Sequence, residues 1–316
     1  MQDISKKKRR SRISFAEAKR KIYRDRALYI MFLPVFIYFV LFKYIPMLGT
    51  VIAFKDYKIA YGILGSQWVG LRHFMRLFSS PNFYTILKNT LVLNLLNLIV
   101  GFPAPIILSI LINEVYHNLY KRTVQTVLYV PHFISWVILG GIVIQLFALE
   151  GPVNVVLGKL VPGYSSISFL GQPVSWVVVY VLSGVWQSAG WGTVLYLAAI
   201  TNVDEQLYEA ARLDGAGKFQ QVVNVTLPCI SGTIVVLLIM RMGQMLNVGF
   251  EQIYMLQNKG VLNVSDVIST YEYRVGLEDR QYSYTTALGL FKGLIGFVLV
   301  FVTNKIATGL GEEGLW

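Results

Sequence analysis

The chain has 316 residues, of which 55% are hydrophobic and only 14% are charged. A soluble globular domain carries about 25% charged residues, so the composition excludes a water-soluble fold and indicates a polytopic membrane protein. The formal net charge is +11. Residues 1–26 hold eleven Lys or Arg against three acidic residues, a net charge of +8. Next to a hydrophobic span, such a basic arm predicts a segment kept in the cytoplasm near anionic lipid, and no nucleic-acid partner is expected.

Six hydrophobic stretches follow the basic arm, and each has enough residues to cross a bilayer as a helix. The first exceeds a signal-peptide core in length, so we expect an uncleaved span. An external segment, residues 50–83, should be mostly extended with one short helix at the membrane surface. Two prolines, Pro103 and Pro105, should kink or widen the second span. The predicted spans are residues 27–49, 85–112, 126–149, 173–200, 227–250 and 284–304.

An even number of spans places both ends of the chain on one side of the membrane. The basic arm marks that side as the cytoplasm, where the tail, residues 309–316, should also lie. We therefore expect an all-α, multi-pass protein of the cytoplasmic membrane, with a membrane domain covering residues 27–308.

A polar stretch, residues 203–228, separates the fourth and fifth predicted spans. Asp204 is a favourable N-cap, strong helix formers follow it, and Gly215 comes just after the helical pattern. Gly215 also permits a left-handed turn that a side chain resists. These residues predict a short helix, a glycine turn and a second short helix. Because a two-turn helix cannot bury its apolar face alone, we expect it to dock into a partner.

The sequence YEAARLDGAGKFQQVVNVTLP within this stretch resembles the EAA loop of permeases from ATP-driven (ABC) importers. Further segments, among them FKYIPMLGTVIAFKDY, TVLYVPHFISWVILGG and YSYTTALGLFKG, extend the resemblance over nearly the whole chain from residue 27. They resemble the LplB-type permeases of oligosaccharide and polysaccharide importers, within the maltose-type family. The resemblance implies a five-helix MetI-like core, an extra N-terminal span and cytoplasmic coupling helices.

The same resemblance implies the partners of the chain. They are a second, homologous permease subunit in a heterodimer, two ABC ATPase subunits, an extracellular or periplasmic solute-binding protein, membrane lipid and a carbohydrate substrate. The coupling helix would seat in a cleft of the ATPase subunit. The residues that would form this contact are Tyr208, Glu209, Ala210, Ala211, Leu213, Asp214 and Gly215.

We do not expect this chain to catalyse a reaction itself. There is no G-x-x-x-x-G-K-[ST] phosphate loop, and the three histidines lie scattered over different segments. We therefore predict no enzyme activity, no catalytic residue, no metal site and no bound cofactor. ATP and Mg²⁺ would be bound by the partner ATPase.

Ionisable residues inside predicted spans are costly in lipid and are therefore candidates for the substrate path. Arg241 and Lys292 are two such cations, and no acidic residue lies in the middle of any predicted span to pair with them. Arg241, Gln244, Asn247 and Glu251 follow one another at three- and four-residue spacing, which predicts a polar stripe along one helix face. Three more candidates, able to hydrogen-bond or stack on sugar, lie on the fourth span: Trp186, Gln187 and Trp191.

Several interpretations of these residues remain open. The two cations could serve structure, with Arg241 bracing backbone carbonyls and Lys292 extending toward the membrane surface. They could instead favour an oligosaccharide that carries uronic acid, or form a salt bridge with the second permease. At the level of the whole chain, the alternatives to an oligosaccharide importer are a permease for another small solute and a polytopic enzyme acting on lipid-linked sugar. The enzyme would need clustered carboxylates or a metal site, and neither occurs at a recognisable spacing.

Overall fold

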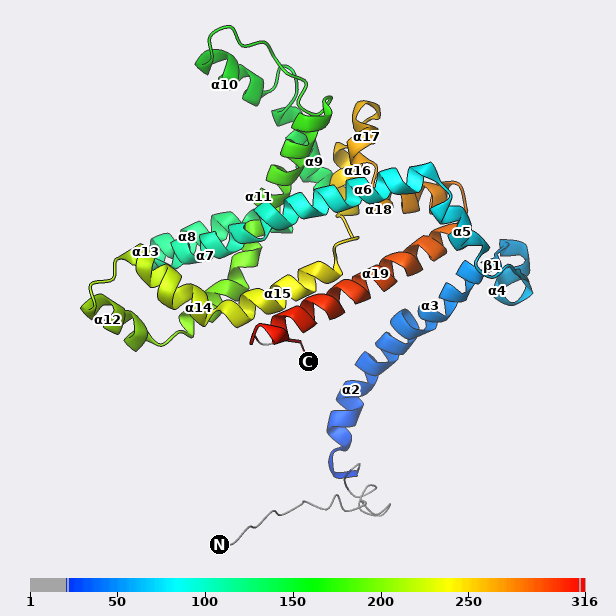
Figure 1. Cartoon of the computed structure of the whole chain (residues 1–316), viewed down its shortest axis with the longest axis horizontal. Coiled ribbons are helices and arrows are strands. Elements are labelled where there is room, and N and C mark those ends of the chain that lie inside the picture. The colour runs from blue at the N-terminus through cyan, green and yellow to red at the C-terminus, as the bar shows by residue number, and fades with distance from the viewer. Residues whose placement is uncertain (1–20, 22, 313, 316) are drawn as a thin grey trace.

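The computed structural model of the chain describes residues 21, 23–312, 314 and 315. Most of the predicted basic arm, residues 1–20 and 22, therefore lies outside the described residues. Within the described range the chain is mostly helical (Figure 1). Its sheet is a minimal hairpin, in which β1 (Lys55–Asp56) pairs antiparallel with β2 (Gln67–Trp68). The predicted all-α class is confirmed.

The first predicted span is a continuous helical segment, Arg26–Phe54. Its last part, η2, packs against α19, whereas no residue of α2 is buried. In Figure 1 the segment meets α19 near β1 and then diverges from it toward the N-terminus. The segment consists of α2 (Arg26–Phe39), η1 (Val40–Tyr44), α3 (Ile45–Leu48) and η2 (Gly49–Phe54).

The external segment predicted as mostly extended contains more helix than expected. The β1–β2 hairpin encloses two short helical turns, and a further helix follows the hairpin. The prediction of one short helix in residues 50–83 is therefore wrong. The elements are η3 (Ile59–Tyr61), α4 (Gly62–Gly65) and α5 (Arg72–Phe78).

The second predicted span is one helical segment, Pro81–Asn113, built from α6 (Pro81–Leu96), η4 (Asn97–Gly101) and α7 (Pro103–Asn113). The middle part, η4, is a π-helical turn directly before Pro103. Proline lacks the N–H that would close the preceding turn, and its ring crowds the carbonyl four residues earlier. The predicted widening of this helix is thus confirmed.

Two of the predicted spans are bent. In the third, α8 (Asn118–Tyr129) with η5 (Val130–Phe133) meets α9 (Trp136–Leu146) at 102°. In the fifth, the segment Lys218–Cys229 meets α15 (Ser231–Gly243) at 63°. That segment comprises α13 (Lys218–Gln221), η6 (Val222–Thr226) and α14 (Leu227–Cys229).

The fifth helix ends earlier than predicted. α15 stops at Gly243, and residues 244–249 form a turn before α16 (Phe250–Leu256) begins. Glycine has a low helix propensity, and it flanks this turn on both sides, at Gly243 and Gly249, so the sequence favours a helix end there. The predicted span 227–250 is therefore wrong at its outer end.

By length and apolar composition, three described helices could cross a membrane, or five if each bent pair is one span. The fourth predicted span, α11 (Pro173–Thr201), is not among them, although its 29 residues extend about 43 Å. Its polar residues account for this, and two of them, Ser183 and Thr193, are buried in the protein. The remaining long helix is α19 (Tyr282–Gly309).

Two hydrophobic clusters hold the long helices together. One surrounds Trp176 and Tyr180 of α11 and includes Ile253 of α16. The other joins α5, α6 and α19 through Leu77, Phe83 and Leu288. The remaining short elements are α10 (Pro152–Leu160), α12 (Glu205–Leu213), η7 (Lys259–Val261), α17 (Leu262–Ser265), α18 (Ile268–Tyr271) and η8 (Glu272–Glu278).

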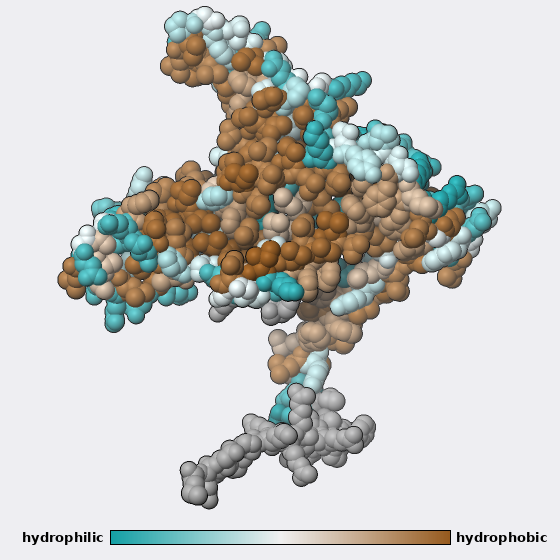
Figure 2. Space-filling view, viewed as in Figure 1, coloured by the Kyte–Doolittle hydropathy of each residue, from teal (hydrophilic) through white to brown (hydrophobic). Residues whose placement is uncertain are grey.

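The surface is divided between apolar and hydrophilic regions. Figure 2 shows apolar residues over the long helices, with hydrophilic residues at the end that carries α12 and at the opposite end, near α4. A protein surrounded by water rarely exposes so continuous an apolar surface. The arrangement suits a molecule whose middle lies in lipid.

Candidate functional site

A polar cavity of about 340 Å³ lies among the second predicted span, α11 and the turn that follows α15. It lies between apolar helices, yet its polar lining is made of amide, hydroxyl and guanidinium groups. The lining residues that carry these groups are Asn94, Asn97, Tyr180, Gln187, Ser188, Arg241, Asn247 and Gln252, and Trp136 adds an aromatic ring.

The π-turn positions one wall of this cavity. Asn97, its first residue, donates a hydrogen bond of 3.1 Å to the hydroxyl of Tyr180 on α11. One turn earlier, Asn94 donates to the backbone carbonyl of Met245 at 2.8 Å. That carbonyl lies in the turn after α15, where no helical partner is available to it. The two asparagines therefore connect the second predicted span to both of the other walls.

Gln252 of α16 fixes a further wall of the cavity. It is buried, and its Nε2 donates to the carbonyl of Tyr180 at 2.7 Å and to the Ser183 hydroxyl at 3.2 Å. Gly184, on the same face of α11, leaves room for it, since a Cβ there would lie 3.2 Å from the Gln252 amide. α16 is thereby held against α11 beside the cavity.

Three of the eight predicted substrate-path residues meet in this cavity: Gln187, Arg241 and Asn247. The helix stripe predicted to contain two of them does not exist, because α15 ends before Gln244. Gln244 instead lies in the turn, where its Oε1 accepts a hydrogen bond of 2.9 Å from Asn247 Nδ2. Glu251 lies beyond the turn, on the exposed side of α16.

The other three candidates do not line the cavity. Trp186 is about half exposed on α11. Trp191 packs in parallel on the His132 ring, with 5.0 Å between ring centroids. Lys292 forms an ion pair of 2.7 Å with Glu272 of η8. No acidic residue in the middle of a predicted span was available to Lys292, and the structure supplies its partner from the predicted external segment between the fifth and sixth spans instead.

Most residues of the polar lining were not among the substrate-path residues predicted from the sequence. Asn94 and Asn97 share one face of the second predicted span, which was a usable signal. Ser188 and Tyr180 on α11 look like ordinary packing residues in a linear sequence. Gln252 falls beyond the predicted end of the fifth span, so only the turn after Gly243 could bring it to the cavity.

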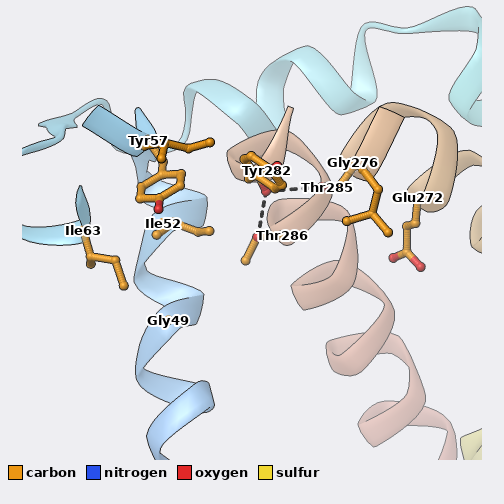
Figure 3. Close-up of a pocket in the computed structure, with 11 residues that line it drawn as sticks. Gly49, Ile52, Tyr57, Ile63, Glu272, Gly276, Tyr282, Thr285 and Thr286 are labelled. Atoms are coloured by element: carbon orange, nitrogen blue, oxygen red, sulfur yellow. Dashed lines mark hydrogen bonds between the residues drawn. The ribbon is translucent and has the colours of Figure 1, made fainter. Parts of the chain in front are cut away.

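A second cavity, of about 580 Å³, lies between the first span and α19 (Figure 3). Two of its hydroxyl groups are already used, because Thr285 and Thr286 donate to the carbonyl of Tyr282 at 3.2 Å and 2.7 Å. Its carboxylate, Glu272, is neutralised by Lys292. The rest of its lining is mainly apolar, so this cavity offers a sugar few free hydrogen-bonding groups.

The loop between α11 and α15 has the predicted helix–turn–helix structure. α12 begins after Asp204, whose carboxylate accepts a hydrogen bond of 3.0 Å from the Gln206 backbone N–H. Gly215 adopts a φ of +80°, in the left-handed region. The Ala216 N–H then bonds the Ala211 carbonyl at 2.8 Å, which closes the C-terminus of α12.

Two side-chain contacts hold this loop to the helices. The Tyr208 hydroxyl lies 2.9 Å from that of Thr226, so Tyr208 faces the bundle. Lys218 forms an ion pair of 2.6 Å with Glu114, after α7. The hydrogen bond to Glu114 raises the pKa of Lys218 above its ordinary value. Leu207 and Leu213 remain exposed, and none of the residues that the structure describes covers them.

Apolar helices around a polar cavity, with a polar helix–turn–helix between two of them, define a membrane transport subunit. Residues 101–311 match the family model described as "Binding-protein-dependent transport system inner membrane component". The chain belongs to this family, and the resemblance drawn from the sequence is confirmed. Members of this family are permease subunits and not enzymes in themselves, as expected.

Individual relatives agree with this assignment. The chain is 47% identical over 315 residues to the polygalacturonan/rhamnogalacturonan transport system permease protein YteP of Bacillus subtilis (strain 168), covering 99% of this chain and 96% of that one. It is 45% identical to Protein LplB of the same organism, covering 93% and 92%. A crystal structure of a bacterial ABC transporter involved in the import of the acidic polysaccharide alginate matches with a TM-score of 0.84 and 42% identity, covering 92% of this chain and 97% of that one.

Proposed function

We propose that this chain is the transmembrane permease subunit of an ATP-driven importer, and that it moves oligosaccharides or polysaccharide fragments across the cytoplasmic membrane. The observation that carries the proposal is the cavity that contains Arg241, Gln187 and Asn247, in a chain 47% identical to a polygalacturonan/rhamnogalacturonan permease. Amide, hydroxyl and guanidinium groups that converge on one cavity suit the many hydroxyl groups of a sugar.

The proposal includes six spans, with α11 as the span that apolar composition alone does not reveal. A helix of 29 residues is long enough to cross the membrane. Neighbouring helices shield its polar residues, so low apolarity does not prevent it from spanning. With the basic residues 1–26 inside, both termini and the loop that carries α12 lie in the cytoplasm.

The uncovered surfaces of the chain and its relatives together indicate three kinds of partner. The apolar, unburied α2 suits contact with a second, homologous permease subunit. The exposed Leu207 and Leu213 of α12 suit docking into an ATPase subunit, which would bind ATP and Mg²⁺. A solved bacterial alginate ABC transporter, in complex with an alginate pentasaccharide-bound periplasmic protein, is 41% identical to this chain with a TM-score of 0.85. A solute-binding protein is therefore the third partner.

Transport would proceed by alternating access. Closure of the ATPase pair displaces α12, whose surface groups Glu209, Ala210, Ala211 and Asp214 would form the contact together with Leu213. The motion passes to α11 and α15, the two helices that continue from the loop. These helices also carry Gln187 and Arg241. A displacement of the loop is therefore transmitted to two walls of the cavity.

The test is co-purification of this chain with the second permease and the ATPase, followed by ATP hydrolysis in lipid with and without loaded binding protein. Loaded binding protein should stimulate hydrolysis in the wild type. Glu209→Lys should lose both the ATPase subunit and the stimulation, because it reverses a charge at the docking surface. Glu150→Lys makes the same charge change in the turn after α9 and should retain the ATPase subunit.

The outcomes separate the remaining possibilities. A wild-type complex without an associated ATPase would remove the basis of the proposal. A complex that is stimulated only by a binding protein loaded with a small sugar or a polyol would keep the permease function and change the substrate.

A further inference from the structure

We infer that the Arg241 guanidinium makes this cavity selective for sugars that carry a carboxylate, so that the transported oligosaccharide contains uronic acid residues. The inference rests on the proposed function, since it concerns the substrate of the same cavity. It assigns the charge of that substrate and names the residue that would recognise it.

The first observation is that Arg241 lacks an acidic partner in the part of the chain that the structure describes. The salt bridges there join Arg24 to Asp25, Lys218 to Glu114, Arg274 to Asp266 and Lys292 to Glu272. Arg241 belongs to none of them; it is among the residues that line the polar cavity, and it is exposed in the described chain. An ionised group in a membrane-embedded protein is costly unless an opposite charge or a set of hydrogen bonds compensates it.

The second observation is the contrast with Lys292. Both cations lie in predicted spans, but Lys292 is paired with Glu272 at 2.7 Å, and the two side chains are only 15% and 23% exposed. The fold thus neutralises one of the two cations and leaves the other facing the cavity. If Arg241 served stability alone, a carboxylate such as Glu272 would be expected beside it as well.

The third observation is that the rest of the polar lining is neutral and largely occupied. No Asp or Glu is among the described residues that line the cavity. The amide groups of Asn94, Asn97 and Gln252 each donate to a group of the protein. Arg241 is therefore the main source of unused hydrogen-bond donors on this surface.

These observations together define what the cavity favours. A guanidinium presents five N–H donors in a planar fork that matches a carboxylate with two parallel hydrogen bonds. A neutral sugar could accept those hydrogen bonds but would leave the charge uncompensated. A uronic acid supplies both the geometry and the opposite charge. Trp136, in the same lining, gives the sugar ring an aromatic face to contact.

The decisive experiment measures binding to the complete permease–ATPase complex in lipid nanodiscs, without binding protein, so that the preference of the binding protein does not enter. The probes are radiolabelled trigalacturonate and its trimethyl ester, which differ in charge and share the ring stereochemistry. The wild type should bind the acid at least tenfold more tightly than the ester. Arg241→Gln should reduce this ratio to about one, and Arg241→Lys should give an intermediate ratio, because lysine keeps the charge and loses the fork.

Lys292→Gln is the matched control. It also removes a cation from a predicted span, but one that the chain itself neutralises, so the acid-to-ester ratio should stay at the wild-type value even if the complex becomes less stable. A purely structural role for Arg241 would weaken binding of both probes equally and leave the ratio unchanged.

Equal affinity of the wild type for the two probes, or no measurable binding of the acid, would overturn the inference. Retention of the ratio in Arg241→Gln would also overturn it, because another group would then supply the selectivity. The proposed function is tested separately. It fails if loaded binding protein does not stimulate ATP hydrolysis, whereas normal stimulation with a ratio near one contradicts only the role of Arg241.

Discussion

Lys292 Nζ lies 2.7 Å from Glu272 Oε2, and this ion pair joins the long helix α19 to the π-turn η8. Neither side chain is more than a quarter exposed. Removing one charge leaves the other with little solvent to compensate it, so we expect Glu272→Gln to lower the free energy of unfolding by about 1–3 kcal/mol, the cost of a buried donor that loses its partner. The decrease should appear as a lower thermal unfolding midpoint in detergent.

The exposed ion pair of the α12 loop is the control for that prediction. Lys218 and Glu114 approach to 2.6 Å, but their side chains are 57% and 41% exposed. An exposed pair contributes less than about 1 kcal/mol, so Glu114→Gln should leave the midpoint almost unchanged. Equal losses for Glu114→Gln and Glu272→Gln would show that burial does not decide the strength of these pairs.

Gly190 is a point of close approach between α11 and α8. A Cβ built on it would lie 1.9 Å from the Leu128 carbonyl oxygen and 2.5 Å from its carbon. Because both atoms belong to the backbone, Gly190→Ala requires the two helices to separate, at a cost of about 3 kcal/mol. We expect a strong loss of folded protein, measured by size-exclusion chromatography of the detergent-solubilised chain.

A second glycine shows whether that loss comes from the contact. Gly293, within α19, has no atom within 4 Å of the position that a Cβ would occupy. Gly293→Ala should therefore be neutral or stabilising by up to about 1 kcal/mol, since alanine favours the helix. If both variants lost folded protein alike, the Gly190 contact could not be the cause.

Trp176 connects α11 to the end of α16. Its side chain is fully buried, and its indole Nε1 donates a hydrogen bond of 2.9 Å to the Leu256 carbonyl. Trp176→Phe keeps an aromatic ring but leaves that buried carbonyl without its donor, which costs about 1–3 kcal/mol. Trp186→Phe, at a half-exposed position of the same helix, should cost little. Thermal unfolding of the two variants, followed by circular dichroism, checks the difference.

Substitutions at Gly215 distinguish the effect of backbone strain from that of steric contact. Its φ is +80°, and no atom lies within 4 Å of the position of an added Cβ. Among the described residues the backbone conformation is therefore the obstacle to a side chain, and asparagine tolerates it better than β-branched valine. Stimulated ATP hydrolysis should be largely retained in Gly215→Asn and lost in Gly215→Val. Equal activity of the two variants would contradict a role for the left-handed turn.

The local structure of this protein could be predicted well from its sequence. Long apolar stretches correspond to the helices Arg26–Phe54, Pro81–Asn113 and Tyr282–Gly309. The cap at Asp204 and the left-handed turn at Gly215 also appear as expected. These features depend on residues close together in the chain, namely on hydropathy, capping and backbone freedom. The family could be recognised for a related reason, because its motif occupies one short contiguous loop.

The composition of the cavity depended on tertiary structure. Three long-range hydrogen bonds, from Asn94 to Met245, from Asn97 to Tyr180 and from Gln252 to Tyr180, bring its walls together across 151, 83 and 72 residues. Periodicity placed Arg241, Gln244 and Asn247 on one helix face, but α15 ends at Gly243, so the turn decided which of them face the cavity.

Membrane location, helical class and the loop that carries α12 were thus determined by the sequence itself, since short-range preferences and transfer from water to lipid act on each segment separately. The bends of 102° and 63°, the partner of Lys292 and the exposure of Arg241 to the cavity were decided only by tertiary structure. The physical reason is that packing between distant segments chooses which polar groups find partners within the chain and which face the cavity without one.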